Sequence, residues 1–139
     1  MTTQWAAQFL VAAELERNGY VVSFTMGHAT KAADLMVGHE ETGKQFWVDV
    51  KGLAKPTSWP GGGTKAPRKN LFYILVLVCP TRANDRFFIL SQSEWDGLVN
   101  QYGEEHPNQK SRTGGFNWTA PHRFENKWSK LPSWQSRSN

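Results

Sequence analysis

Cysteine is nearly absent from this chain of 139 residues, in which Cys79 stands alone. One cysteine excludes an internal disulfide and fits a reducing compartment. Because Cys79 ends an apolar stretch, a buried and inert thiol is favoured over a nucleophile. Zinc-ligand spacing, a phosphate-cradling glycine motif and an internal repeat are missing as well, so the sequence offers none of those three routes to a function.

Long hydrophobic runs are also lacking. The apolar stretch Leu71–Cys79 is far too short to span a bilayer, which takes about 20 residues. No basic segment precedes the N-terminal apolar run, and Gln8 and Glu14 interrupt that run, so no signal peptide is indicated. We therefore expect a cytoplasmic protein without a membrane partner, folded as a single domain over residues 1–139.

Acidic residues are missing from one stretch of the chain. Residues 51–70 contain five bases and no acid, whereas residues 1–50 carry six acids against three bases. A basic extension that contains several aromatics follows from about residue 104. An acidic half flanked by basic segments suits a polyanion held over carboxylates, although a basic loop can also be simply solvated. The five bases are Lys51, Lys55, Lys65, Arg68 and Lys69.

The order of apolar and turn-forming residues predicts an α/β fold, with a mixed β-sheet of about five strands flanked by helices. Ser91 and Glu94 have the spacing of a capping box at the start of the second helix. Residues 52–70 are too rich in glycine and proline for a regular element, and Trp59 among them is expected to pack rather than to stack on a base. We expect helices over residues 2–19 and 91–103, a short amphipathic helix near 124–131, and strands over 20–25, 33–37, 45–51, 71–78 and 86–90.

Two of these strands form a hairpin that brings chemistry-bearing residues together. If His39 faces Lys44 across the polar turn, antiparallel register places Asp34 directly opposite Asp49. Opposed side chains have Cβ atoms about 4.5–5.5 Å apart, so the two carboxylates repel each other unless a cation lies between them. Lys51 points to the same face. The pattern indicates a divalent-metal site for phosphodiester cleavage; the alternative is a wet face on which a lysine neutralises an aspartate.

The segments A-D-L-M-V (residues 33–37) and W-V-D-V-K-G (residues 47–52), after a leading helix and strand, resemble the PD-(D/E)XK nuclease superfamily. Residues 1–105 are similar in order and spacing to its small single-domain members related to archaeal Holliday-junction resolvases. The resemblance implies a restriction-endonuclease-like fold. It also implies that Asp34, Asp49 and the carbonyl of Val50 hold Mg²⁺ or Mn²⁺, and that Lys51 positions or activates the attacking water.

Three features depart from the family pattern. Ala33 stands where the motif's proline would be, which is common among relatives. Gln8 stands where many members carry a glutamate on the first helix; a glutamine can accept a hydrogen bond but supplies no negative charge. An irregular segment replaces the helix that many relatives place after the lysine strand.

We therefore expect a divalent-metal-dependent DNA endonuclease whose catalytic residues are Asp34, Asp49, Lys51 and Gln8. DNA is the expected partner, a homodimer is left open, and the expected nucleic-acid contacts are Lys55, Lys65, Arg68 and Lys69. Two alternatives stay open: a catalytically impaired nuclease-like module that binds nucleic acid, and a structural or regulatory subunit whose acids pair with lysines. Divalent-ion binding separates the first function from the other two, and salt-dependent DNA binding separates those two.

Overall fold

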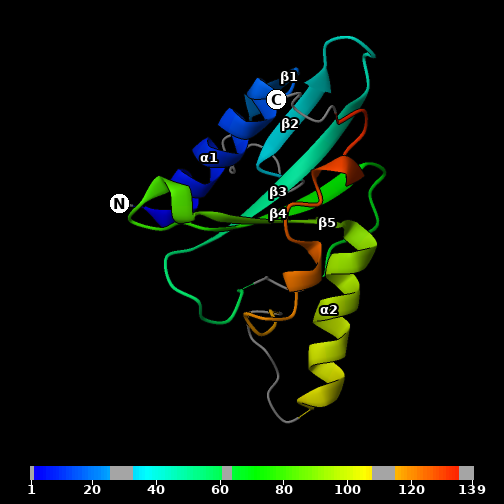
Figure 1. Cartoon of the computed structure of the whole chain (residues 1–139). Coiled ribbons are helices and arrows are strands. Elements are labelled where there is room, and N and C mark those ends of the chain that lie inside the picture. Colours follow the sequence, from blue (N-terminus) through cyan, green and yellow to red (C-terminus); the bar gives the residue numbers. More distant parts are fainter. Residues whose placement is uncertain (1, 26–32, 61–63, 108–114, 135–139) are drawn as a thin grey trace.

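The computed structural model describes residues 2–25, 33–60, 64–107 and 115–134. Its strands are β1 (Tyr20–Phe24), β2 (Leu35–His39), β3 (Gln45–Leu53), β4 (Leu71–Leu77) and β5 (Arg86–Ser91), and its α-helices are α1 (Thr3–Arg17) and α2 (Gln92–Glu105). The strands form one sheet in the order β1-β2-β3-β4-β5 (Figure 1). Only the β3–β4 pair among them is parallel. The predicted α/β fold, a mixed five-stranded sheet flanked by helices, is confirmed.

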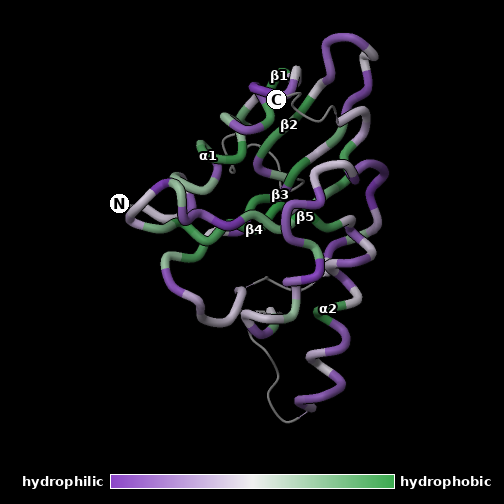
Figure 2. Tube along the Cα trace, viewed as in Figure 1, coloured by the Kyte–Doolittle hydropathy of each residue, from purple (hydrophilic) through white to green (hydrophobic). Residues whose placement is uncertain are grey.

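The sheet separates two hydrophobic clusters. On one face, Ala7, Val11 and Leu15 of α1 pack against Val48 and Val50 of β3. On the other face, α2 and the segment 115–124 cover a second cluster. Figure 2 shows the apolar residues concentrated along the sheet, with polar residues at the β2–β3 turn and over much of α2. The two faces of β3 therefore meet different helices, and residues that alternate along it face different surroundings.

The β2–β3 hairpin has the predicted register. The amide of His39 donates to the carbonyl of Lys44 at 2.8 Å, and Leu35 pairs with Val48. Continued by one position, this register sets Asp34, the residue before β2, opposite Asp49. The apolar alternation fixes this register, because a slip of one residue would exchange the buried and polar faces of the strand.

The connection from β3 to β4 is irregular, as its glycines and prolines predict, and it crosses the face that α2 covers. Trp59 is fully buried there, and its backbone pairs with Phe116 in an isolated bridge. The indole Nε1 of Trp59 donates to the carbonyl of Trp118 at 3.2 Å. The prediction that Trp59 packs is therefore confirmed, and the C-terminal segment holds the crossover in place.

The C-terminal segment returns to the sheet without forming the expected amphipathic helix. Two short 3₁₀ turns, His122–Phe124 and Trp128–Lys130, occupy this region instead. Asn126 between them has φ of 56°, a left-handed conformation that interrupts a right-handed helix. Leu131 is nevertheless buried in the α1-side cluster, so the expected apolar contact is made by other geometry.

The end of α1 and the start of α2 follow the signals in the sequence, whereas α2 runs to Glu105, two residues past the expected end. Gly19, with φ of 87°, follows α1 in the left-handed conformation that favours glycine. The hydroxyl of Ser91 and the carboxylate of Glu94 form the predicted capping box at the start of α2. No helix of the described residues is both long and apolar enough to cross a membrane.

Candidate functional site

Asp34 and Asp49 meet where β2 begins and the middle of β3 passes beside it. The amide of Asp34 donates to the carbonyl of Val48 at 3.0 Å, and Oδ2 of Asp34 accepts from the amide of Val50 at 2.8 Å. The register places the two carboxyl groups side by side on one face of the sheet. Burial first, and then the neighbouring Asp49, raise the pKa of Asp34 to about 6, although the Val50 amide opposes the shift.

Two lysines flank the carboxylate of Asp49. Lys51 Nζ lies 3.3 Å from Oδ1, and Lys65 Nζ contacts Oδ2. The Asp49 side chain is only 4% exposed, whereas those of Lys51 and Lys65 are 22% and 34% exposed. Two acids and two ammonium groups are thus gathered on this face of β3, with Lys65 reaching it from the crossover. Sequence reasoning expected Lys51 here but assigned Lys65 to a phosphate-binding loop.

The edge of β3 beside this site is open, because β2 pairs only as far as Val48. The side chain of Gln4 covers it: Nε2 donates to the carbonyl of Val50 at 2.6 Å, and Oε1 accepts from the amide of Gly52 at 3.2 Å. A single amide side chain thereby imitates the two bonds of a neighbouring strand. Gln4 was not among the site residues predicted from the sequence. Its one signal there was its position one helical turn before Gln8.

Gln8 lies on the buried side of α1 and is 7% exposed. Among the described residues, no hydrogen bond joins its side chain to Asp34, Asp49 or Val50. The helical residue that reaches β3 is therefore Gln4, four positions earlier. The role expected of Gln8 stays a prediction.

Aromatic side chains lie behind the acids on the same face of the sheet. Tyr73 pairs with Asp49 in the β3–β4 register and stacks on Trp95, with ring centroids 4.4 Å apart. Its buried hydroxyl has no hydrogen-bond partner among the described residues. Burial, followed by the charges of Asp49 and Asp96, raises the pKa of Tyr73 well above its ordinary value. The Lys51 ammonium lies 5.8 Å from the centre of the Trp95 ring, so this aromatic wall also lines the lysine.

The other expected nucleic-acid contacts lie in the crossover. Arg68 is exposed, and its guanidinium lies 5.6 Å from the centre of the Trp47 ring. Trp47 is two positions before Asp49 and hence on the same strand face. Lys55 and Lys69 are exposed, and no ion pair to either is found in the described part of the chain. Arg68 therefore lies over the strand face that carries Asp49, whereas no contact among the described residues ties the Lys55 and Lys69 side chains to it.

The residues at the acids fit a divalent cation in number and kind. Two carboxylates and the Val50 carbonyl are oxygen ligands, which Mg²⁺ and Mn²⁺ prefer. Burial and, after it, the charge of Asp49 raise the pKa of Asp34, and a cation between the carboxylates would offset both effects. No cluster of three or more histidine, cysteine or acidic residues suited to a metal occurs in the described ranges, so a metal here would complete its coordination with water.

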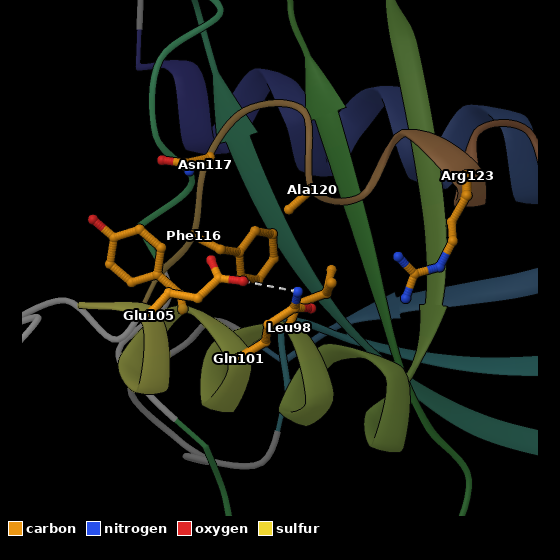
Figure 3. A pocket seen from close by; sticks show the side chains of 8 residues that line it. Leu98, Gln101, Glu105, Phe116, Asn117, Ala120 and Arg123 are labelled. Carbon is orange, nitrogen blue, oxygen red and sulfur yellow. Dashed lines mark hydrogen bonds between the residues drawn. The ribbon is translucent and has the colours of Figure 1, made fainter. Parts of the chain in front are cut away.

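A separate hollow lies between α2 and residues 116–123 (Figure 3). Its volume is about 140 Å³, and its wall includes Leu98, Arg123 and the hydrogen-bonded pair Gln101 and Glu105. None of the candidate site residues lines it, so this hollow and the acid cluster are different places.

Compared with known proteins, the chain matches no family model, no curated protein and no solved structure.

Proposed function

We propose that this chain is a divalent-metal-dependent DNA endonuclease of the PD-(D/E)XK kind. The observation that carries the proposal is the hairpin register that sets Asp34 opposite Asp49, with Lys51 beside Asp49. A structural ion pair between Asp49 and Lys51 gains nothing from a second carboxyl group held against it, because like charges in a partly buried place cost free energy. Two acids side by side are the arrangement that a site for a divalent cation uses.

In this proposal, Asp34, Asp49 and the carbonyl of Val50 hold Mg²⁺ or Mn²⁺. When bound, the ion would polarise the scissile phosphate and lower the pKa of the attacking water. Gln4 fixes the Val50 carbonyl by donating to it from α1. Gln8 is kept as a further helix residue of the site, supported only by its place in the resemblance.

Lys51 is the side chain that would act directly on the reacting groups. Its ammonium group would orient the attacking water and stabilise negative charge on the phosphate oxygens. The water oxygen bonds to phosphorus, and the bond from phosphorus to the leaving sugar oxygen breaks. The leaving oxygen takes up a proton, and the proton lost by the water passes to solvent.

A second candidate is a nuclease-like module that binds nucleic acid without cutting it. Two observations favour it: Asp49 already has a lysine on each oxygen, and Gln8 supplies no charge where many relatives have a glutamate. A purely structural or regulatory subunit is the third reading, in which the lysines only neutralise Asp49.

The test is nicking of supercoiled plasmid in Mg²⁺, in Mn²⁺ and in a chelator, combined with calorimetric titration of Mn²⁺. The proposal expects cleavage by the wild-type protein, which Asp34→Asn and Asp49→Asn each abolish together with ion binding. Glu40→Gln, an exposed acid at the hairpin turn, is the matched control and should change neither. DNA binding without ion binding would favour the second candidate, and the absence of both would favour the third.

A further inference from the structure

We propose that Lys65 is a second catalytic lysine, which contacts the scissile phosphate and stabilises the charge that develops on it. Gln92 holds Lys65 over Asp49. This inference rests on the proposed function and names a further residue of the same site. It changes the part expected of Lys65 from one of several loop contacts along the DNA backbone to a contact at the cleaved bond.

The backbone around Lys65 is fixed by Gln92, the first residue of α2. Its Nε2 donates to the carbonyl of Ala66 at 3.1 Å and reaches that of Lys65 at 3.4 Å. Its Oε1 accepts from the amide of Arg68 at 2.9 Å. One glutamine side chain therefore holds three positions of the crossover against the start of a helix.

Further contacts anchor this segment on both sides. The carbonyl of Asn70 accepts from the amide of Trp47 at 2.8 Å, and the Arg68 guanidinium lies over the Trp47 ring. Earlier in the crossover, Trp59 is buried against the C-terminal segment. A lysine on a free loop loses side-chain and backbone entropy when it forms an ion pair. Here the fold already fixes the backbone at Lys65, so the ion pair costs only side-chain entropy. This is expected for a positioned functional group.

The charges at the site also favour a role toward an anion. The carboxylates of Asp34 and Asp49 can balance one divalent cation. The ammonium groups of Lys51 and Lys65 then remain as surplus positive charge on either oxygen of Asp49. A phosphodiester gains negative charge as water adds to it, so two ammonium groups beside the reacting phosphate match the transition state better than the ground state.

The test compares Lys65→Gln with Lys44→Gln, which removes the same charge from an exposed position at the far end of the hairpin. At saturating DNA and Mg²⁺, Lys65→Gln should slow single-turnover cleavage by about 10²–10³-fold and weaken DNA binding far less. Lys44→Gln should leave both unchanged. Lys65→Gln should also tighten Mn²⁺ binding several-fold in calorimetry, because a cation that competes for Oδ2 of Asp49 is removed.

Gln92→Ala gives a second, independent test because it keeps every charge. It should slow cleavage at saturating DNA while leaving the salt dependence of DNA binding unchanged, with circular dichroism confirming the fold. Wild-type cleavage rates in Lys65→Gln, while Asp49→Asn is inactive, would overturn the inference and leave the proposed function standing. Weaker DNA binding with an unchanged saturated rate would overturn it too. Absence of cleavage and of Mn²⁺ binding in the wild-type protein would instead refute the proposed function itself.

Discussion

Gln4 closes the open edge of β3 by donating from Nε2 to the carbonyl of Val50 at 2.6 Å. Its Oε1 accepts from Gly52, so one side chain satisfies two backbone groups that β2 leaves unpaired. Gly52 lets the helix come this close: a Cβ there would lie 2.8 Å from that of Ala7. The hydrogen bonds of Gln4 tie α1 to the part of β3 that carries Asp49 and Lys51.

Gln4→Ala should lower the free energy of unfolding by about 1 kcal/mol, since a partly buried hydrogen-bonded side chain is removed. Gln4→Glu should be destabilising as well, because a carboxylate can accept from Gly52 but cannot donate to Val50. Urea unfolding measures both. Equal stability of all three proteins would show that the edge is satisfied without this side chain.

Asp34 predicts a pH dependence of stability in the metal-free protein. Because its folded pKa is raised to about 6, from an unfolded value of about 3.9, the folded state binds its proton more tightly. The contribution of this group to stability is therefore present below about pH 4 and is lost as pH rises through about 6. Asp34→Asn should remove this loss.

The measurement for Asp34 is the difference in unfolding free energy between Asp34→Asn and the wild-type protein. This difference should grow in favour of the variant from pH 4 to pH 6 and then level off. Taking the difference matters because Glu125, whose pKa is lowered by its hydrogen bonds to Arg86, makes a contribution of opposite sign in acid. A flat difference would contradict the burial of Asp34 beside Asp49.

The exposed bases of the crossover predict a salt effect. Replacing Lys55, Arg68 and Lys69 together by glutamine should weaken DNA binding similarly for all sequences. It should also reduce the salt slope by about 0.9 for each phosphate of duplex DNA that the variant no longer neutralises. Asp49→Asn should leave DNA binding intact or tighter, because it removes repulsion of phosphate. If the triple variant keeps the wild-type salt slope, Arg123 and Lys127 of the C-terminal segment become the better candidates for the phosphate contacts.

Gly115 predicts a large loss of stability on a small substitution. A Cβ at this position would lie 1.7 Å from the carbonyl oxygen of Trp59, a backbone atom that cannot rotate away. Gly115→Ala should therefore lower the free energy of unfolding by about 1–3 kcal/mol. Gly97→Ala is the matched control: it lies inside α2 with nothing within 4 Å of the added carbon. It should stabilise the protein by about 0.5–1 kcal/mol.

The sequence predicts the parts of the site that depend on local order. The period of two along a strand and the length of one turn suffice to set Asp34 opposite Asp49, because hairpin register is a short-range property. Lys51 follows from the same alternation. The strand boundary differs slightly from the prediction: β2 begins one residue after Asp34, although the expected strand included it.

The remaining site residues depend on how distant elements pack. Gln4 reaches β3 because of where α1 crosses the sheet, and the spacing of polar residues in the helix does not determine that crossing. Lys65 belongs to a segment without a regular period. Its place over Asp49 follows from the hydrogen bonds of Gln92 to this segment and from the bond between Asn70 and Trp47, which no local pattern encodes. The expected helix near residues 124–131 fails at Asn126 for a related reason, since its left-handed backbone directs the chain along the sheet.

The hydroxyl of Tyr20, at the start of β1, donates to the carbonyl of Pro132 at 2.6 Å across 112 positions of the chain, and Trp134 stacks on the same ring. Such distant partners raise the mean sequence separation of contacts, which slows folding. During synthesis, the aromatic cluster around β1 cannot close until residue 134 has left the ribosome. Until then, the Tyr20 ring at the start of the edge strand β1 lacks the stacking of Trp134, and this interval is when the chain is most open to pairing with another copy of itself.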